Sequence, residues 1–154
     1  MRPNRIVRNC FIEPIQAVEE LVEDNPHDVF LVRESIRSKG IDAQVVWFGD
    51  IPEAITAILD QNFGRPDLLL LDLNLPRGEG LEVLAVVRST GRLADLPVAV
   101  LTSSESPRDQ ERASNYGVNA YIIKPLELDA FLENVGGTVK ELLRTGAAIE
   151  TAVH

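Results

Sequence analysis

The chain has 154 residues, of which 45% are hydrophobic and 25% charged, the composition of one folded domain with its own core. Its formal net charge of −9 would repel phosphate backbones, which argues against nucleic acid as the main partner. No apolar stretch approaches the roughly 20 residues of a membrane span, and the N-terminus lacks the apolar core of a secretory signal. The single cysteine, Cys10, excludes an internal disulfide and suits a reducing compartment, so we expect a soluble cytoplasmic protein.

Residues 16–22 must supply a first strand if strands and helices are to alternate along the whole chain. Their apolar positions nevertheless have helical spacing, and Glu19 and Glu20 fall where a central strand should be apolar. We expect a short strand with these glutamates at its exposed beginning. The alternative is a displaced, partly helical segment, which would carry Glu23 and Asp24 away from the sheet.

Apolar runs typical of strands then alternate with segments of helical spacing. In chain order, the predicted elements are helix 29–39, strand 43–48, helix 52–59, strand 67–72, helix 81–87, strand 98–101, helix 107–116, strand 120–123 and helix 128–143. Trp47 and Phe48, at the end of an edge strand, are expected in the core. Strands separated by helices predict an α/β fold, a parallel sheet with helices on both faces.

Polar residues follow four of the predicted strands. Glu23 and Asp24 follow the first, Asp72 stands at the carboxyl end of the third, Thr102 follows the fourth and Lys124 follows the fifth. The carboxyl ends of parallel strands are where open α/β sheets bind ligands. Three acids there would repel one another unless a divalent cation lay between them, and carboxylate oxygens suit Mg²⁺. A lysine and a hydroxyl could bind an anion held by that metal. The pattern favours phosphoryl transfer, with the aspartate after the third strand attacking to form an acyl phosphate.

The chain resembles the receiver domain of two-component response regulators over residues 17–144, flanked by an N-terminal extension, 1–16, and a tail, 145–154. The motifs that carry the resemblance are Val22-Glu23-Asp24-Asn25-Pro26, Leu70-Leu71-Asp72-Leu73-Asn74-Leu75-Pro76, Val100-Leu101-Thr102-Ser103-Ser104 and Tyr121-Ile122-Ile123-Lys124-Pro125. In finer detail, the chain resembles the single-domain regulators that partner bacterial phytochrome kinases, in the motifs Asn25-Pro26-His27-Asp28, Asp72-Leu73-Asn74-Leu75-Pro76 and Leu101-Thr102-Ser103-Ser104. The resemblance implies a flavodoxin-like (CheY-like), doubly wound sheet of five parallel strands in the order 2-1-3-4-5.

The resemblance also implies a role for each residue of the site. Asp72 would accept a phosphoryl group from a histidine of a sensor kinase, which makes the protein a phosphoacceptor rather than a classical enzyme. Mg²⁺ would be held by Glu23, Asp24, Asp72 and the backbone carbonyl of Asn74. Lys124 would pair with the phosphoryl oxygens.

A second set of implied residues would carry the signal. Thr102 would swing its hydroxyl to the phosphoryl group and Tyr121 would follow inward. This change would remodel the surface of helix 107–116, strand 120–123 and helix 128–143, through which we expect a homodimer. Asn74 and Ser104 flank the site and would tune how fast water removes the phosphoryl group.

Three other functions compete with this interpretation. A haloacid-dehalogenase-like phosphatase also forms an aspartyl phosphate, but it needs a second acid where this chain has Asn74. A flavodoxin-like FMN carrier needs a phosphate-binding loop after the first strand, where Glu23 and Asp24 would repel phosphate. A receiver used as a phosphorylation-independent adaptor stays open, because a displaced first strand would dismantle the acidic site.

Overall fold

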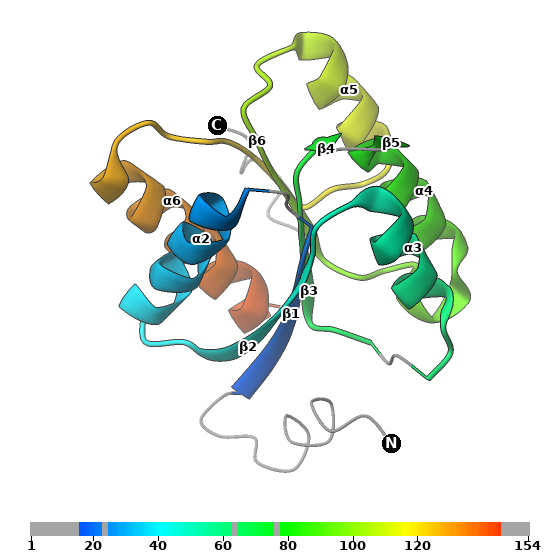
Figure 1. Ribbon diagram of the computed structural model, residues 1–154, viewed down its shortest axis with the longest axis horizontal. Helices are drawn as coiled ribbons and strands as arrows, with labels where there is room; N and C mark the ends of the chain where they lie inside the picture. The colour runs from blue at the N-terminus through cyan, green and yellow to red at the C-terminus, as the bar shows by residue number, and fades with distance from the viewer. Residues whose placement is uncertain (1–15, 23–24, 63–64, 76–77, 146–154) are drawn as a thin grey trace.

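A central parallel sheet organises the chain, in the residues 16–22, 25–62, 65–75 and 78–145 that the computed structural model describes (Figure 1). Its strands are β1 (Gln16–Val22), β2 (Asp42–Phe48), β3 (Leu68–Leu71), β6 (Val98–Thr102) and β7 (Ala120–Ile123). They lie in the order β2-β1-β3-β6-β7, with every neighbouring pair parallel. The predicted five-stranded sheet and its order are therefore confirmed.

Helices cover both faces of this sheet. Figure 1 shows two of them on one side, α2 (Pro26–Ser38) and α6 (Leu128–Thr145). The other side carries α3 (Ile51–Leu59), α4 (Gly80–Ser89) and α5 (Pro107–Asn115). The sequence did not predict the short η1 (Gly91–Leu93) or the small hairpin of β4 (Asn74–Leu75) and β5 (Gly78–Glu79). No helix in the described ranges is both long and apolar enough to cross a membrane.

The first strand is in place and is longer than expected. All seven residues of β1 pair with β2, and its last four also pair with β3. Strand pairing uses backbone groups, and Glu19 and Glu20 supply these as well as apolar residues do. The partly helical alternative and the expected short strand are therefore both wrong. The strand ends with Val22 level with Leu71, the residue before Asp72.

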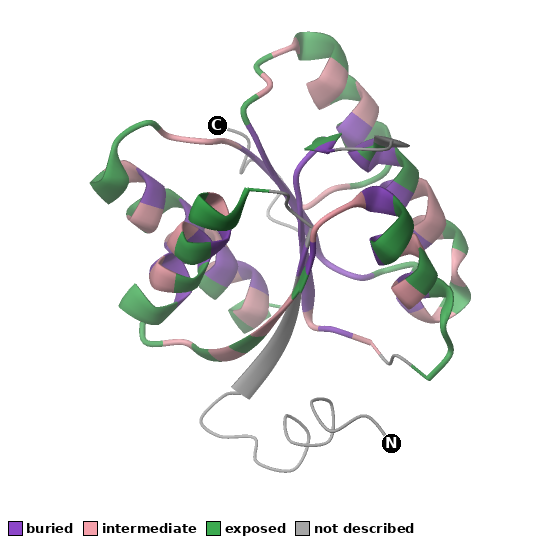
Figure 2. Cartoon of the chain, in the orientation of Figure 1, coloured by how far each residue is buried: buried purple, intermediate pink, exposed green. Residues whose placement is uncertain are grey.

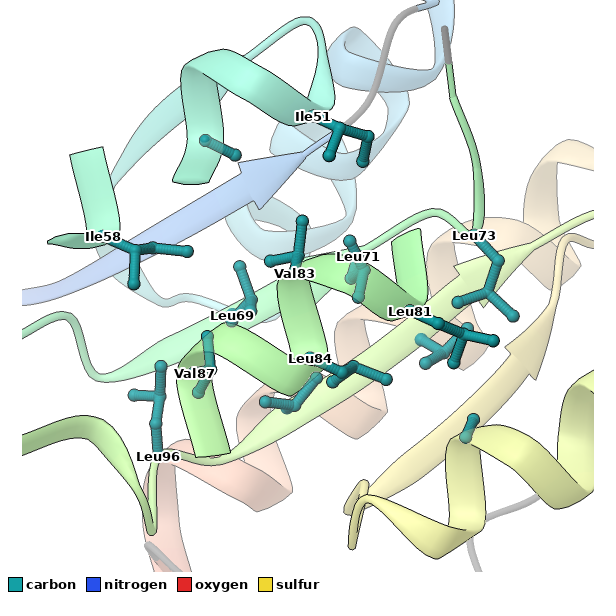
Figure 3. Close-up of a cluster of buried hydrophobic side chains, with 14 of the residues drawn as sticks. Ile51, Ile58, Leu69, Leu71, Leu73, Leu81, Val83, Leu84, Val87 and Leu96 are labelled. Carbon is teal, nitrogen blue, oxygen red and sulfur yellow. The ribbon is translucent and has the colours of Figure 1, made fainter. Parts of the chain in front are cut away.

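The four leucines of β3 are completely buried because the strand is central and both faces of the sheet are covered. Leu68 and Leu70 belong to the core beneath α2 and α6. Leu69 and Leu71 belong to the core beneath α3 and α4, where Figure 3 shows them among the side chains of those helices. Figure 2 shows the same burial along the middle of the sheet. The strand therefore joins two apolar layers.

Helix starts are fixed by side-chain caps at the carboxyl end of the sheet. Asn25 accepts a hydrogen bond from the His27 N–H at the start of α2, and the next residue is Pro26. Asp50 and Ser106 cap α3 and α5 in the same way, each with proline in the first turn. A proline there costs no hydrogen bond, because the first N–H groups of a helix have no partner within it. Helix α2 consequently begins three residues before its predicted start.

The edge strand β2 departs from the expectation at Trp47. Consecutive strand residues point to opposite faces of a sheet. Phe48 is 8% exposed and belongs to the core beneath α3, whereas Trp47 on the other face is 40% exposed. β2 lies at the edge of the sheet, and the helices that cover the sheet need not extend equally far over its two faces. Phe48 is a core residue as predicted, and the prediction for Trp47 is wrong.

Helices α2 and α6 lie side by side and are closely packed at Gly136. A Cβ atom added to Gly136 would stand 2.5 Å from the backbone oxygen of Ser35, closer than real Cβ contacts come. The adjacent Gly137 has open space around the same position. The close packing of this helix pair therefore requires glycine at position 136 but not at position 137.

Candidate functional site

Asp72 follows β3 at the carboxyl end of the sheet and is 6% exposed. One carboxylate oxygen, Oδ1, accepts the backbone N–H of Asn74 at 3.0 Å. The other, Oδ2, accepts from the Lys124 ammonium at 2.9 Å. A buried carboxylate is costly unless it is paired and hydrogen-bonded, and here both oxygens have donors. The structure thus holds the side chain of Asp72 in a fixed orientation.

Lys124 brings the end of β7 to Asp72. Its backbone N–H donates to the Thr102 carbonyl at 2.8 Å, which extends the pairing of β6 and β7 to the site. Its ammonium also donates to Asp28 Oδ2 at 2.7 Å. The three charged side chains are largely buried, with exposures of 12% for Lys124, 16% for Asp28 and 8% for Asp72. One lysine therefore bridges two carboxylates from different parts of the chain.

Asp28 is the site residue that sequence reasoning missed. It lies in the first turn of α2, where an acid is common simply because it suits the helix dipole. Only the fold brings it to Lys124, across 96 residues of sequence. The motif Asn25-Pro26-His27-Asp28, to which it belongs, indicated a family resemblance but did not predict this contact.

Thr102 is completely buried at the end of β6 and connects two loops of the site. Its hydroxyl oxygen accepts the Ser104 N–H at 3.3 Å. The side-chain amide of Asn74 reaches the same oxygen at 3.5 Å. Asn74 thus contacts Asp72 through its backbone and Thr102 through its side chain. The predicted grouping of these three residues is present in the fold.

Tyr121 lies in β7 with 1% of its surface exposed, and its hydroxyl donates to the Ser104 carbonyl at 3.1 Å. Burial raises the pKa of this phenol, and the side chain of Ser104 lowers it by a smaller amount. The nearby carboxylates of Asp109 and Asp72 raise this pKa further. The phenol is therefore a neutral donor at ordinary pH. Ser104 is itself held, because its hydroxyl donates to Asp109 Oδ2 at 2.6 Å and accepts the Ser106 N–H at 3.2 Å.

The start of α4 packs on the backbone of Asp72. Gly80 donates its N–H to the Leu73 carbonyl at 2.9 Å, and a Cβ there would stand 2.5 Å from the Asp72 backbone oxygen. Glu79, the preceding residue, pairs with Arg112 of α5 at 3.3 Å. The start of α4 is consequently connected both to Leu73, beside Asp72, and to α5.

Glu23 and Asp24, the predicted metal ligands after β1, lie outside the described residues. Among the residues that are described, no three histidine, cysteine or acidic side chains gather as a metal-binding group. Of the acids at the site that are described, Asp72 and Asp28 both bond to the Lys124 ammonium.

The sequence matches a family model described as "Response regulator receiver domain" over residues 20–136. A curated relative, the probable methanogenesis regulatory protein FilR2 of Methanothrix harundinacea, is 38% identical over 125 residues, covering 79% of this chain and 78% of that one. The response regulator Rcp1 of Synechocystis is 36% identical over 129 residues, covering 81% of this chain and 88% of that one.

Solved structures with the same fold include phytochrome-associated regulators. The phosphorylated cyanobacterial phytochrome response regulator RcpA superposes with a TM-score of 0.77 at 34% identity, covering 86% of this chain and 97% of that one. The Mn(2+)-bound form of Rcp1 superposes with a TM-score of 0.74 at 36% identity, covering 84% and 96%.

Proposed function

Because this chain belongs to the response regulator receiver family of two-component signalling, we propose that it is a regulator in which Asp72 accepts a phosphoryl group from a sensor histidine kinase. The observation that carries this proposal is the buried Asp72 carboxylate, bonded to Lys124 and to a backbone N–H at the carboxyl end of the sheet. The receiver unit would span residues 17–144, which contains the matched range 20–136.

The proposed reaction moves one phosphoryl group between two nucleophiles. A carboxylate oxygen of Asp72 attacks phosphorus while the P–N bond of the kinase phosphohistidine breaks, and the electron pair of that bond returns to the imidazole, which takes a proton from solvent. Hydrolysis by water later restores the carboxylate and releases inorganic phosphate. The Lys124 ammonium, 2.9 Å from Asp72 Oδ2, would neutralise charge on the transferred group.

Mg²⁺ is the proposed cofactor. A divalent cation supplies charge neutralisation to the incoming phosphoryl group. The donor set fits a hard cation, because Asp72, Glu23 and Asp24 offer carboxylates and Asn74 a carbonyl. Two observations support this set: β1 ends at Val22 level with Leu71, and Rcp1 has been solved in a Mn(2+)-bound form.

The proposed switch runs from Thr102 to Tyr121. Both are buried, and both are bonded to Ser104, Thr102 through the Ser104 N–H and Tyr121 through the Ser104 carbonyl. If the Thr102 hydroxyl turned to a phosphoryl group, it would release the Ser104 N–H and shift the loop before α5. The surface formed by α5, β7 and α6 would then change shape. Asn74 and Ser104 would tune the rate of autodephosphorylation.

We expect acetyl phosphate in Mg²⁺ to place one acid-labile phosphate on the wild-type chain and none on Asp72→Asn, because the amide is not a nucleophile. Intact-protein mass spectrometry, before and after acid or hydroxylamine treatment, measures this difference. Asp95→Asn is the matched control, since that aspartate is 88% exposed and pairs with Arg65 away from the site. Label that persists on Asp72→Asn, or an unlabelled wild type, would contradict the proposal, and an unlabelled wild type would favour the adaptor.

Phosphorylation is also expected to promote a homodimer through the surface of α5, β7 and α6. Sedimentation velocity with and without beryllofluoride, a phosphate mimic, should show the larger species only when the mimic is bound. Asp72→Asn provides the control, because it removes the group that the mimic occupies. A monomer in both states of the wild type would refute this part of the proposal.

The proposed kinase partner is of the phytochrome type. Its support is the likeness to RcpA, which is described as a cyanobacterial phytochrome response regulator and is 34% identical to this chain.

A further inference from the structure

We propose that Asp28 is a positioning residue, which holds the Lys124 ammonium beside the phosphoacceptor before and after the phosphoryl group arrives. This inference rests on the proposed function, because it assigns a role to Lys124 in phosphoryl transfer. The observation behind it is that Lys124 donates to Asp28 at 2.7 Å as well as to Asp72 at 2.9 Å.

The N-terminus of α2 is built to place Asp28 at this point. Asn25 accepts the His27 N–H and Pro26 opens the helix, so the position of the first turn is fixed. Asp28 lies in that turn with a side chain that is 16% exposed. A favourable interaction with the helix dipole needs an acid near the helix start, but it does not need that acid to be buried against a lysine 96 residues away.

Lys124 benefits from a second carboxylate because its side chain is long and flexible. Holding it in one orientation opposes its rotamer entropy, which is larger for lysine than for most residues. An ammonium has several N–H donors and can bond two carboxylates at once. When one oxygen of Asp72 becomes part of an acyl phosphate, the bond to Asp28 still holds the ammonium near the new group. The lysine is therefore oriented in both states of the acceptor.

The charge of Asp28 and its positioning role predict opposite effects on the reaction rate. A carboxylate close to Asp72 repels an incoming anion, so removing its charge would speed phosphorylation if repulsion were its main effect. If Asp28 instead orients Lys124, removing the charge slows phosphorylation, because the ammonium loses one of the carboxylates that hold it. The direction of the change separates the two roles.

The experiment compares Asp28→Asn with wild type in acetyl phosphate at saturating Mg²⁺. We expect the initial rate of labelling to fall about tenfold, as for a group that orients a catalytic side chain. Asp28→Glu keeps the negative charge at the helix start and should recover part of the rate. Glu34→Gln on the same helix is the matched control, because it breaks only the exposed pair with Arg37 and should leave the rate unchanged. Urea unfolding of each variant confirms that it is folded.

A double-mutant cycle tests whether Asp28 acts through Lys124. In a Lys124→Ala background, Asp28→Asn should lower the rate no further, since the side chain that Asp28 orients is gone. An equal loss in both backgrounds, an unchanged rate in Asp28→Asn, or a faster one would overturn the inference. Failure of the proposed function has a different result, because the wild type itself would then remain unlabelled.

Discussion

Replacing Lys124 with methionine should lower the free energy of unfolding by about 3 kcal/mol, because removing one member of a buried ion pair leaves its partners unpaired. Methionine keeps most of the volume of lysine, so the loss reports charge rather than a cavity. Asp28 and Asp72 would be left as two neighbouring carboxylates that are 16% and 8% exposed. Urea unfolding in metal-free buffer, followed by circular dichroism, measures the change.

Two further variants separate this effect from a general loss of lysine. Lys39→Met breaks the pair of Lys39 with Glu133, whose side chain is 71% exposed, and should cost less than about 1 kcal/mol. Adding Asp28→Asn to Lys124→Met should restore part of the lost stability, because one unpaired carboxylate is removed. Equal losses in the Lys39 and Lys124 variants would show that the buried pairs contribute no more than a surface contact.

Gly136→Ala should destabilise the protein by about 2 kcal/mol, the usual cost of forcing an atom into a packed interior. The added methyl would meet a backbone oxygen of α2, at Ser35, which cannot rotate away as a side chain can. The two helices must therefore separate, and α2 carries Asp28 at its other end. Urea unfolding gives the stability change.

Gly137→Ala is the paired control one residue further along α6. Space around that position is open, and alanine favours helix over glycine by up to about 1 kcal/mol. We therefore expect the control to be as stable as wild type or slightly more stable. If both substitutions changed stability in the same direction, the close approach at Gly136 would not be what limits the packing of α2 and α6.

Most of the fold could be predicted because its strong patterns are local. Four leucines at residues 68–71 indicated a strand buried on both faces, and the structure buries all of them. The first strand was harder, since its side-chain pattern suggested a helix while its place in the sheet depends on backbone pairing with β2 and β3. The hairpin of β4 and β5 has only two residues in each strand, too few for any alternation to be visible.

The candidate site shows the same division between local and long-range information. The places of Asp72 and Lys124 followed from their position after predicted strands, and the structure joins them at 2.9 Å. Asp28 could not be found in this way, because it lies on a helix and meets Lys124 only after the chain has folded. The metal ligands predicted at Glu23 and Asp24 lie outside the described residues and remain predictions.

The burial of β3 has a consequence for where motion can occur around the site. A strand at the centre of the sheet, with all four side chains buried, is expected to open only when the whole domain unfolds. Asp72 directly follows this strand, so we expect its backbone to open as rarely as the strand itself does. Two of the residues near it, Asp28 at a helix start and Ser104 in a loop, belong to segments that open more easily. When Asp72 is chemically modified, its own backbone is therefore expected to stay in place, and the conformational change is expected in the segments around it.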